Sequence, residues 1–83
     1  MNLEEAKKII ENEKLENYVM FSDGLNKPNK VVIQEAKNNW KVFTNDERAV
    51  VTAEKCYSSL SEALDDFIER LRGDKAYRDY LSR

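Results

Sequence analysis

Carboxylates are the side chains in this sequence whose spacing could support chemistry. In residues 59–72, Asp65 and Glu69 are four positions apart, and so are Glu62 and Asp66. On a helix, residues at this spacing are neighbours, so the pairs could bind a hard cation weakly or act as a general acid and base. The apolar residues between them predict, however, that all four acids face solvent. Nothing there would raise a pKa into the catalytic range, and a solvated acidic face is the simpler interpretation.

Other residue types that enzyme sites use are missing or single. The chain contains no histidine, one cysteine and two glycines. This composition excludes nucleophiles activated by histidine, zinc sites built from imidazoles or thiolates, and glycine-rich phosphate loops. We therefore expect no catalytic residues and no metal site. A hydrolase that uses carboxylates alone is the enzymatic alternative.

Length and composition predict one soluble domain that spans residues 1–83. The chain is 41% hydrophobic and 36% charged, with a net charge of -2. The acidic excess argues against direct nucleic-acid binding and is compatible with a basic protein partner. The single cysteine, Cys56, can form no internal disulfide, and we predict that it is a small buried hydrophobe in a strand. No signal peptide or membrane-spanning run is evident, so we expect a cytoplasmic location.

The first predicted helix lies at the start of the chain. Asn2 can cap it, and Glu5 three positions later completes a capping-box pattern. The helix should end near residues 12–16, with Leu15 turned back under the fold. Its apolar seam consists of Leu3, Ala6, Ile9 and Ile10.

The second predicted helix carries the strongest pattern in the chain. One apolar stripe with helical spacing contains Leu60, Ala63, Leu64, Phe67, Ile68 and Leu71. Ser59 and Glu62 form an S-x-x-E capping pattern at its start. Gly73 can end this helix, and Asp74 can then cap a short extra C-terminal helix.

Four short runs of apolar, aromatic and β-branched residues predict strands at residues 18–21, 31–35, 40–44 and 50–57. They are separated by a loop at residues 22–30 and by turns at residues 37–39 and 45–48. Connections of this length favour an antiparallel meander. Because each helix has a single apolar stripe, we predict an α+β fold of order α-β-β-β-β-α, with both helices on one face of the sheet.

Alternation along the third strand assigns its side chains to two faces. It places Trp40 and Val42 on one face and Lys41 and Phe43 on the other. The face without helices should then expose Lys41, Gln34, Thr52 and Glu54 to water.

Several polar and aromatic residues have both a structural and a binding interpretation. Trp40, beside a hairpin turn, is more often a packing residue, but tryptophan is also common among interface hot spots. Tyr77 and Tyr80 suggest core contact or a frayed end before they suggest binding. The segment 45–48 is either a polar turn or a partner-binding loop.

Three segments of the sequence form a pattern together. They are the run Trp-Lys-Val-Phe at residues 40–43 followed by Thr-Asn-Asp-Glu-Arg-Ala at 44–49, the helix at 61–71, and the opening helix at 3–10. This pattern resembles small immunity proteins of bacterial polymorphic toxin systems, most closely the family called immunity protein 59. Proteins of this kind bind a toxin encoded beside them and protect the producing cell. The resemblance implies a cytoplasmic toxin inhibitor without enzymatic activity or cofactor.

We hypothesise that a carboxylate cluster faces a basic surface on the toxin, which would be a nuclease in many such systems, while a few aromatic or arginine contacts give affinity. The candidate partner-binding residues are Asp46, Glu47, Arg48, Trp40, Tyr18, Glu62, Asp65, Asp66 and Glu69. The alternative is a small regulatory or scaffold module, with a homodimer formed through a sheet edge or sheet face.

Overall fold

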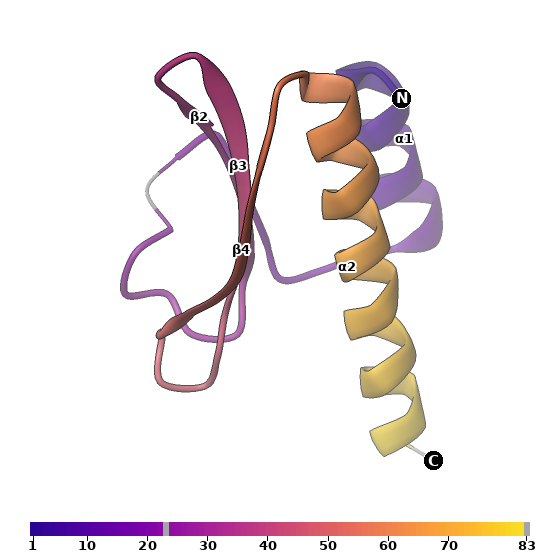
Figure 1. Cartoon of the computed structure of the whole chain (residues 1–83). Helices are drawn as coiled ribbons and strands as arrows, with labels where there is room; N and C mark the ends of the chain where they lie inside the picture. The colour runs from indigo at the N-terminus through magenta and orange to yellow at the C-terminus, as the bar shows by residue number, and fades with distance from the viewer. Residues whose placement is uncertain (23, 83) are drawn as a thin grey trace.

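Two helices cover one face of a four-stranded sheet in the computed structural model, which describes residues 1–22 and 24–82 (Figure 1). The elements in chain order are α1 (Leu3–Glu13), β1 (Tyr18–Met20), β2 (Val31–Ala36), β3 (Asn39–Asn45), β4 (Val51–Tyr57) and α2 (Leu60–Leu81). The predicted α+β class, the element order and the placement of both helices on one side of the sheet are confirmed. None of the described helices has the length and apolar character needed to cross a membrane.

Helix α1 begins and ends where the sequence predicts. The Asn2 Oδ1 accepts a hydrogen bond from the Glu5 N–H at 2.8 Å, and the Glu5 carboxylate accepts from the Asn2 N–H at 3.2 Å. This reciprocal capping box satisfies two backbone donors at the start of the helix. At its other end Lys14 adopts a left-handed conformation, which turns the chain and buries Leu15.

The strand order is β1-β2-β3-β4, and the first pair differs from the predicted meander. β3 pairs antiparallel with β2 and β4, but β1 runs parallel to β2, with Tyr18 opposite Val31. β1 has three residues, so the ten residues between it and β2 suffice to bring the chain back to the starting end. The predicted antiparallel meander was wrong for this pair, because connection length restricts strand direction less when the strand is so short.

The connection between β1 and β2 lies on the far face of the sheet, opposite the helices (Figure 1). The Asn45 side-chain amide donates to the carbonyl oxygens of Gly24 at 2.6 Å and Lys27 at 3.0 Å, which ties this connection to β3. A Cβ at Gly24 would lie 2.5 Å from Val32 Cγ2, so glycine allows the backbone to approach β2 closely.

Beneath this connection is a second, small apolar cluster of Val19, Val32 and Phe43. The prediction of a water-facing far surface therefore holds for Glu54, which is exposed, but only partly for Lys41 and Gln34, which are half-buried. It was wrong for Thr52, which is exposed but lies opposite Thr44, a residue that contacts Arg70 of α2 on the helix face. Gln34 donates to the Ser22 carbonyl oxygen at 3.2 Å. The predicted alternation of Trp40 and Val42 against Lys41 and Phe43 is confirmed.

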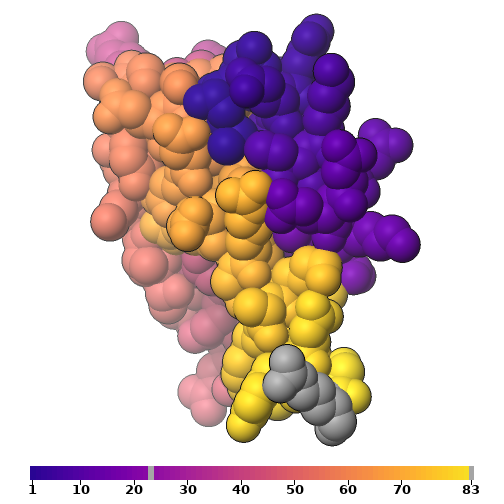
Figure 2. Space-filling view, turned by 90° about the vertical axis from the view of Figure 1, so that its right-hand side faces the viewer, coloured from indigo at the N-terminus to yellow at the C-terminus, as the bar shows by residue number. Residues whose placement is uncertain are grey.

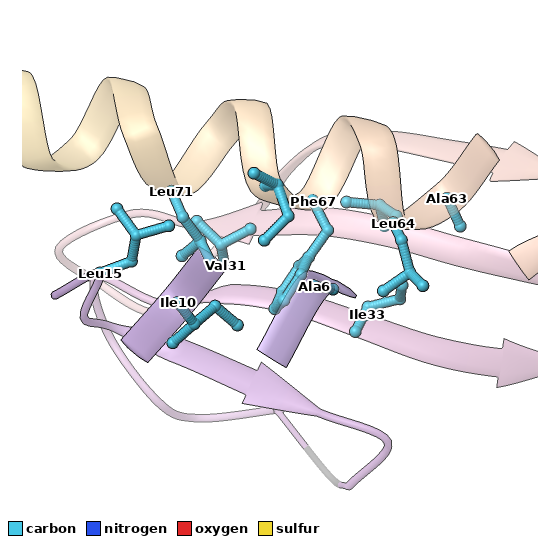
Figure 3. Packing of buried hydrophobic residues seen from close by; sticks show 11 residues of the cluster. Ala6, Ile10, Leu15, Val31, Ile33, Ala63, Leu64, Phe67 and Leu71 are labelled. Atoms are coloured by element: carbon cyan, nitrogen blue, oxygen red, sulfur yellow. The ribbon is translucent and has the colours of Figure 1, made fainter. Parts of the chain in front are cut away.

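The main core lies between the sheet and the helices. Phe67, Leu64 and Leu71 point from α2 toward Val31 and Ile33 of β2, with α1 beside them (Figure 3). Burying an aromatic or aliphatic side chain of this size stabilises a fold by about 1.5–3 kcal/mol. The cluster comprises Ala6, Ile10, Leu15, Val31, Ile33, Val42, Ala63, Leu64, Phe67, Ile68 and Leu71.

Helix α2 is continuous through Gly73, contrary to the predicted break and short extra helix. The second half of the helix is held by ion pairs one turn apart, Asp74 with Arg78 at 2.9 Å and Lys75 with Asp79 at 2.9 Å. Arg78 also binds Glu16 in the turn after α1 at 2.8 Å. One glycine costs a helix about 1 kcal/mol, which such contacts can offset.

We expect Gly73→Ala to stabilise the protein by about 0.5–1 kcal/mol, because Gly73 is in a helix interior and an added Cβ would meet no atom within 4 Å. Thermal unfolding followed by circular dichroism should show a rise in Tm of a few degrees. An unchanged or lower Tm would indicate that the helix is broken at this position after all.

Cys56 is exposed, so its predicted burial is wrong. β4 pairs with β3 only, and Cys56 lies opposite Lys41 on the far face of the sheet. Almost all of β4 is exposed, since it is an edge strand that receives contacts from the helices on one face alone.

Candidate partner-binding surface

The predicted partner-binding residues do not form one patch. Asp46, Glu47 and Arg48 follow β3 at one end of the sheet, whereas Trp40 lies near the start of β3 at the opposite end. Tyr18 is exposed at the start of β1, on the other edge of the sheet from β4. Three of the helix acids, Glu62, Asp65 and Glu69, belong to a third region, the exposed side of α2, and Asp66 is half-buried against the sheet.

Asp46 has a structural role in the turn between β3 and β4. Its Oδ1 accepts hydrogen bonds from the N–H groups of Arg48 at 2.8 Å and Val50 at 3.0 Å. This geometry closes the turn, while the side chains of Glu47 and Arg48 are exposed. The adjacent hollow of about 410 Å³ is lined by acids and by the cations Lys30 and Arg70, so it carries charges of both signs.

Asp66 is bound within the molecule and is not a free acid of the helix surface. Its carboxylate accepts from the Tyr57 hydroxyl at 2.7 Å and from Arg70 at 2.9 and 3.2 Å. Arg70 also donates to Thr44 Oγ1 at 3.0 Å and to the Ala53 carbonyl oxygen at 2.6 Å. The i,i+4 spacing of Asp66 and Arg70 was a sequence signal for this pair, but the contacts to β3 and β4 depend on the fold.

These contacts shift two pKa values in opposite directions. Burial raises the pKa of the Asp66 carboxyl, but hydrogen bonds from Arg70 and Tyr57 and the charges of Arg70 and Lys55 outweigh it, so that pKa is below its usual range. The hydrogen bond to Asp66, together with burial, raises the pKa of the Tyr57 hydroxyl. A carboxylate with a lowered pKa beside an arginine is a structural ion pair and is not poised for proton transfer.

The other three helix acids differ in their hydrogen bonds and ion pairs with the rest of the protein. Ser59 caps α2 as predicted, and its hydroxyl donates to the Glu62 carboxylate at 3.0 Å. Asp65 lies 3.1 Å from the Met1 amino group but keeps 61% of its side-chain surface exposed. Glu69 is exposed and forms no ion pair with another residue of the described chain. Asp65 and Glu69 are therefore the acids most accessible to a partner.

The exposed side of α2 continues beyond these acids as one stripe. We define the outer face of α2 as Glu62, Asp65, Glu69, Gly73, Tyr77 and Tyr80, which follow one another at three- or four-residue spacing. Both tyrosines are exposed, at 62% and 66%. Figure 2 shows α2 at the surface of the described chain, where it lies beside α1.

From the sequence, Tyr77 and Tyr80 were assigned to core contact or a frayed end, and their place on an exposed helix face was not predicted. A usable signal was present, because Tyr77 and Tyr80 continue the spacing of the acids Glu62 and Glu69 and not that of the buried stripe. The outer face of α2 is thus acidic in its first half and aromatic in its second.

Within residues 1–22 and 24–82, no group of three or more Cys, Asp or Glu side chains is arranged to hold a metal ion.

No curated protein and no solved structure matches the sequence significantly. The sequence model of immunity protein 59, by contrast, matches residues 1–78. That match covers both helices up to Arg78 and every strand of the sheet. The chain therefore belongs to the immunity protein 59 family.

Proposed function

We propose that this protein binds a cognate secreted toxin domain in the cytoplasm and neutralises it by covering its active site or a nearby surface. Membership of an immunity protein family is the observation that carries the proposal. Such an inhibitor acts by stoichiometric binding, so it needs a complementary surface and no catalytic group. The outer face of α2 supplies an uncovered surface of this kind.

The two halves of this face have the chemistry of a protein interface. The acids Asp65 and Glu69 would attract a basic surface, such as the substrate cleft of a nuclease, and raise the rate of encounter. Exposed Tyr77 and Tyr80 supply large contact areas with little loss of conformational freedom on binding. In this proposal the acids set the association rate and the tyrosines provide most of the affinity.

A homodimeric scaffold module is the second candidate, because β4 leaves one edge of the sheet unpaired. Two features of β4 work against pairing with another copy. The register shifts between Val42 and Thr44, opposite a left-handed Ala53, and charged Glu54 and Lys55 follow directly. Bulges and edge charges of this type hinder edge-to-edge association. Size-exclusion chromatography with light scattering should therefore give the monomer mass.

Co-expression with the toxin domain encoded by the adjacent gene tests the proposal. We expect restored growth of the host, a complex recovered by pull-down from either partner, and inhibition of the purified toxin that is complete at one equivalent. A toxin domain from an unrelated system is the control for specificity. Inhibition at far less than one equivalent would point to catalysis, and neither protection nor a complex would contradict the proposal.

A further inference from the structure

A groove at the end of the sheet where α2 begins has the shape and chemistry of a side-chain pocket. It has a volume of about 610 Å³, and its apolar walls are Leu3 of α1, Leu60 of α2, Trp40 of β3 and Phe21. Glu35, Gln34 and Ser22 complete its lining. Trp40 lies at this groove and not on the outer face of α2, so the interface proposed above does not account for it.

Phe21 is held at this groove in an unfavourable backbone conformation. Its φ is 60°, in the left-handed region, where the Cβ atom of an L-residue is crowded. Among the described residues, eight non-glycine residues have a positive φ; four are asparagines, which tolerate this region, and Phe21 is the aromatic one. The conformation is held by the Phe21 N–H, which donates to the Ile33 carbonyl oxygen at 2.8 Å.

The result of this conformation is an exposed aromatic ring at the rim of the groove. Phe21 keeps 42% of its surface exposed, and its ring meets Trp40 edge to face with centroids 5.9 Å apart. A strained backbone that leaves a phenylalanine partly in water does little for the stability of the free protein. Such strain is found more often at sites that bind something.

Glu35 gives the groove its charge preference. It lies directly opposite Trp40 in the antiparallel ladder and on the same face, so the two Cβ atoms are about 5 Å apart. Glu35 is exposed and has no ion-pair partner in the described residues, and no lysine or arginine lines the groove. A free carboxylate beside two aromatic rings favours a cation with an apolar stem.

We propose that this groove receives an arginine side chain presented by the toxin domain. The guanidinium group would stack on Trp40 or Phe21 and pair with Glu35, while the aliphatic stem would contact Leu3 and Leu60. The net charge of -2 favours a basic partner. This inference rests on the proposed function and adds a second contact region to it, at the α2 start.

Trp40 is the single tryptophan of the chain, so its fluorescence reports on the groove directly. We expect the Trp40 emission to change when the toxin domain encoded by the adjacent gene binds. Phe21→Asn should weaken binding about tenfold or more without lowering Tm, since asparagine tolerates a positive φ. Glu35→Gln, which removes only the charge, should weaken binding about tenfold.

Two matched variants serve as controls. Val50→Thr removes an exposed apolar residue at the opposite end of the sheet, and Glu11→Gln removes an exposed charge on α1. Both should bind as the unaltered protein does. If the toxin binds but Trp40 emission stays constant and the Phe21 and Glu35 variants keep full affinity, the groove proposal is wrong while the proposed function stands.

A peptide titration decides the groove proposal independently of the toxin. Acetyl-Gly-Arg-Gly-amide should change Trp40 emission in a saturable way at millimolar concentration, and Glu35→Gln should abolish the effect. The same peptide with glutamate in place of arginine should have no effect. Equal responses to both peptides, or none to the arginine peptide, would overturn the arginine assignment even if no toxin complex has been obtained.

Discussion

Arg70→Ala is expected to lower the free energy of unfolding by about 3 kcal/mol, a large fraction of the stability of a domain this size. The Arg70 side chain is 15% exposed and pairs with Asp66 within α2. It joins the helix to β3 and β4 by donating to Thr44 Oγ1 and to the Ala53 carbonyl oxygen. Its loss leaves the Asp66 carboxylate, itself 19% exposed, without its ion-pair partner. Urea unfolding at neutral pH measures the change.

Arg72→Ala is the matched control for this prediction. Arg72 lies two residues later and binds Glu13 at 2.7 Å, but both side chains are well exposed, and such pairs add little in water. The two alanine variants lose the same charge from the same helix. Equal effects on unfolding would show that burial of the Arg70 network contributes nothing.

The same network gives stability a defined pH dependence. Because the folded-state pKa of Asp66 is lowered, its contribution is present above the pKa of the unfolded chain and is lost as the pH falls through the folded value. Tyr57 has a raised pKa, so its contribution is present below its unfolded pKa and is lost as the pH rises beyond it. Asp66→Asn should therefore flatten the acid limb of the stability curve.

Replacing Asp65 and Glu69 together by lysine is expected to slow association with the cognate toxin domain by about tenfold or more at low salt. Both acids are exposed on the outer face of α2, so the change affects encounter without disturbing the core. The dependence of the association rate on ionic strength should also become weaker, because fewer opposite charges are screened. Stopped-flow or surface-plasmon measurements at several salt concentrations test both effects.

Glu4→Lys with Glu11→Lys is the matched control. It changes the net charge equally but places the new charges on α1, one in the first turn and one in the last. Their effects on the helix dipole oppose each other. If the acids on the outer face of α2 act locally on the toxin, the α1 double variant should show a much smaller fall in association rate. Identical rates for the two double variants would mean that net charge alone, and not the outer face of α2, controls encounter.

Local signals in the sequence were sufficient for most of the fold. Asn2, Leu15 and Ser59 behave as their capping and apolar patterns predict, and the strands lie within a residue or two of their predicted bounds. The parallel β1 could not be predicted in this way. Its direction depends on the connection tied down by Asn45 on the far face, a contact between residues about twenty positions apart.

The sequence by itself showed the family resemblance and the lack of histidine. It also determined the two amphipathic helices, because caps and periodicity involve residues only a few positions apart. The tertiary structure decided which charged and aromatic side chains a partner can reach. It bound Asp66 to Arg70 and Tyr57, exposed Tyr77 and Tyr80, and placed Phe21 and Glu35 beside Trp40. Exposure depends on how distant segments pack together, so a local pattern indicates it only in part, as the helical spacing of Tyr77 and Tyr80 does.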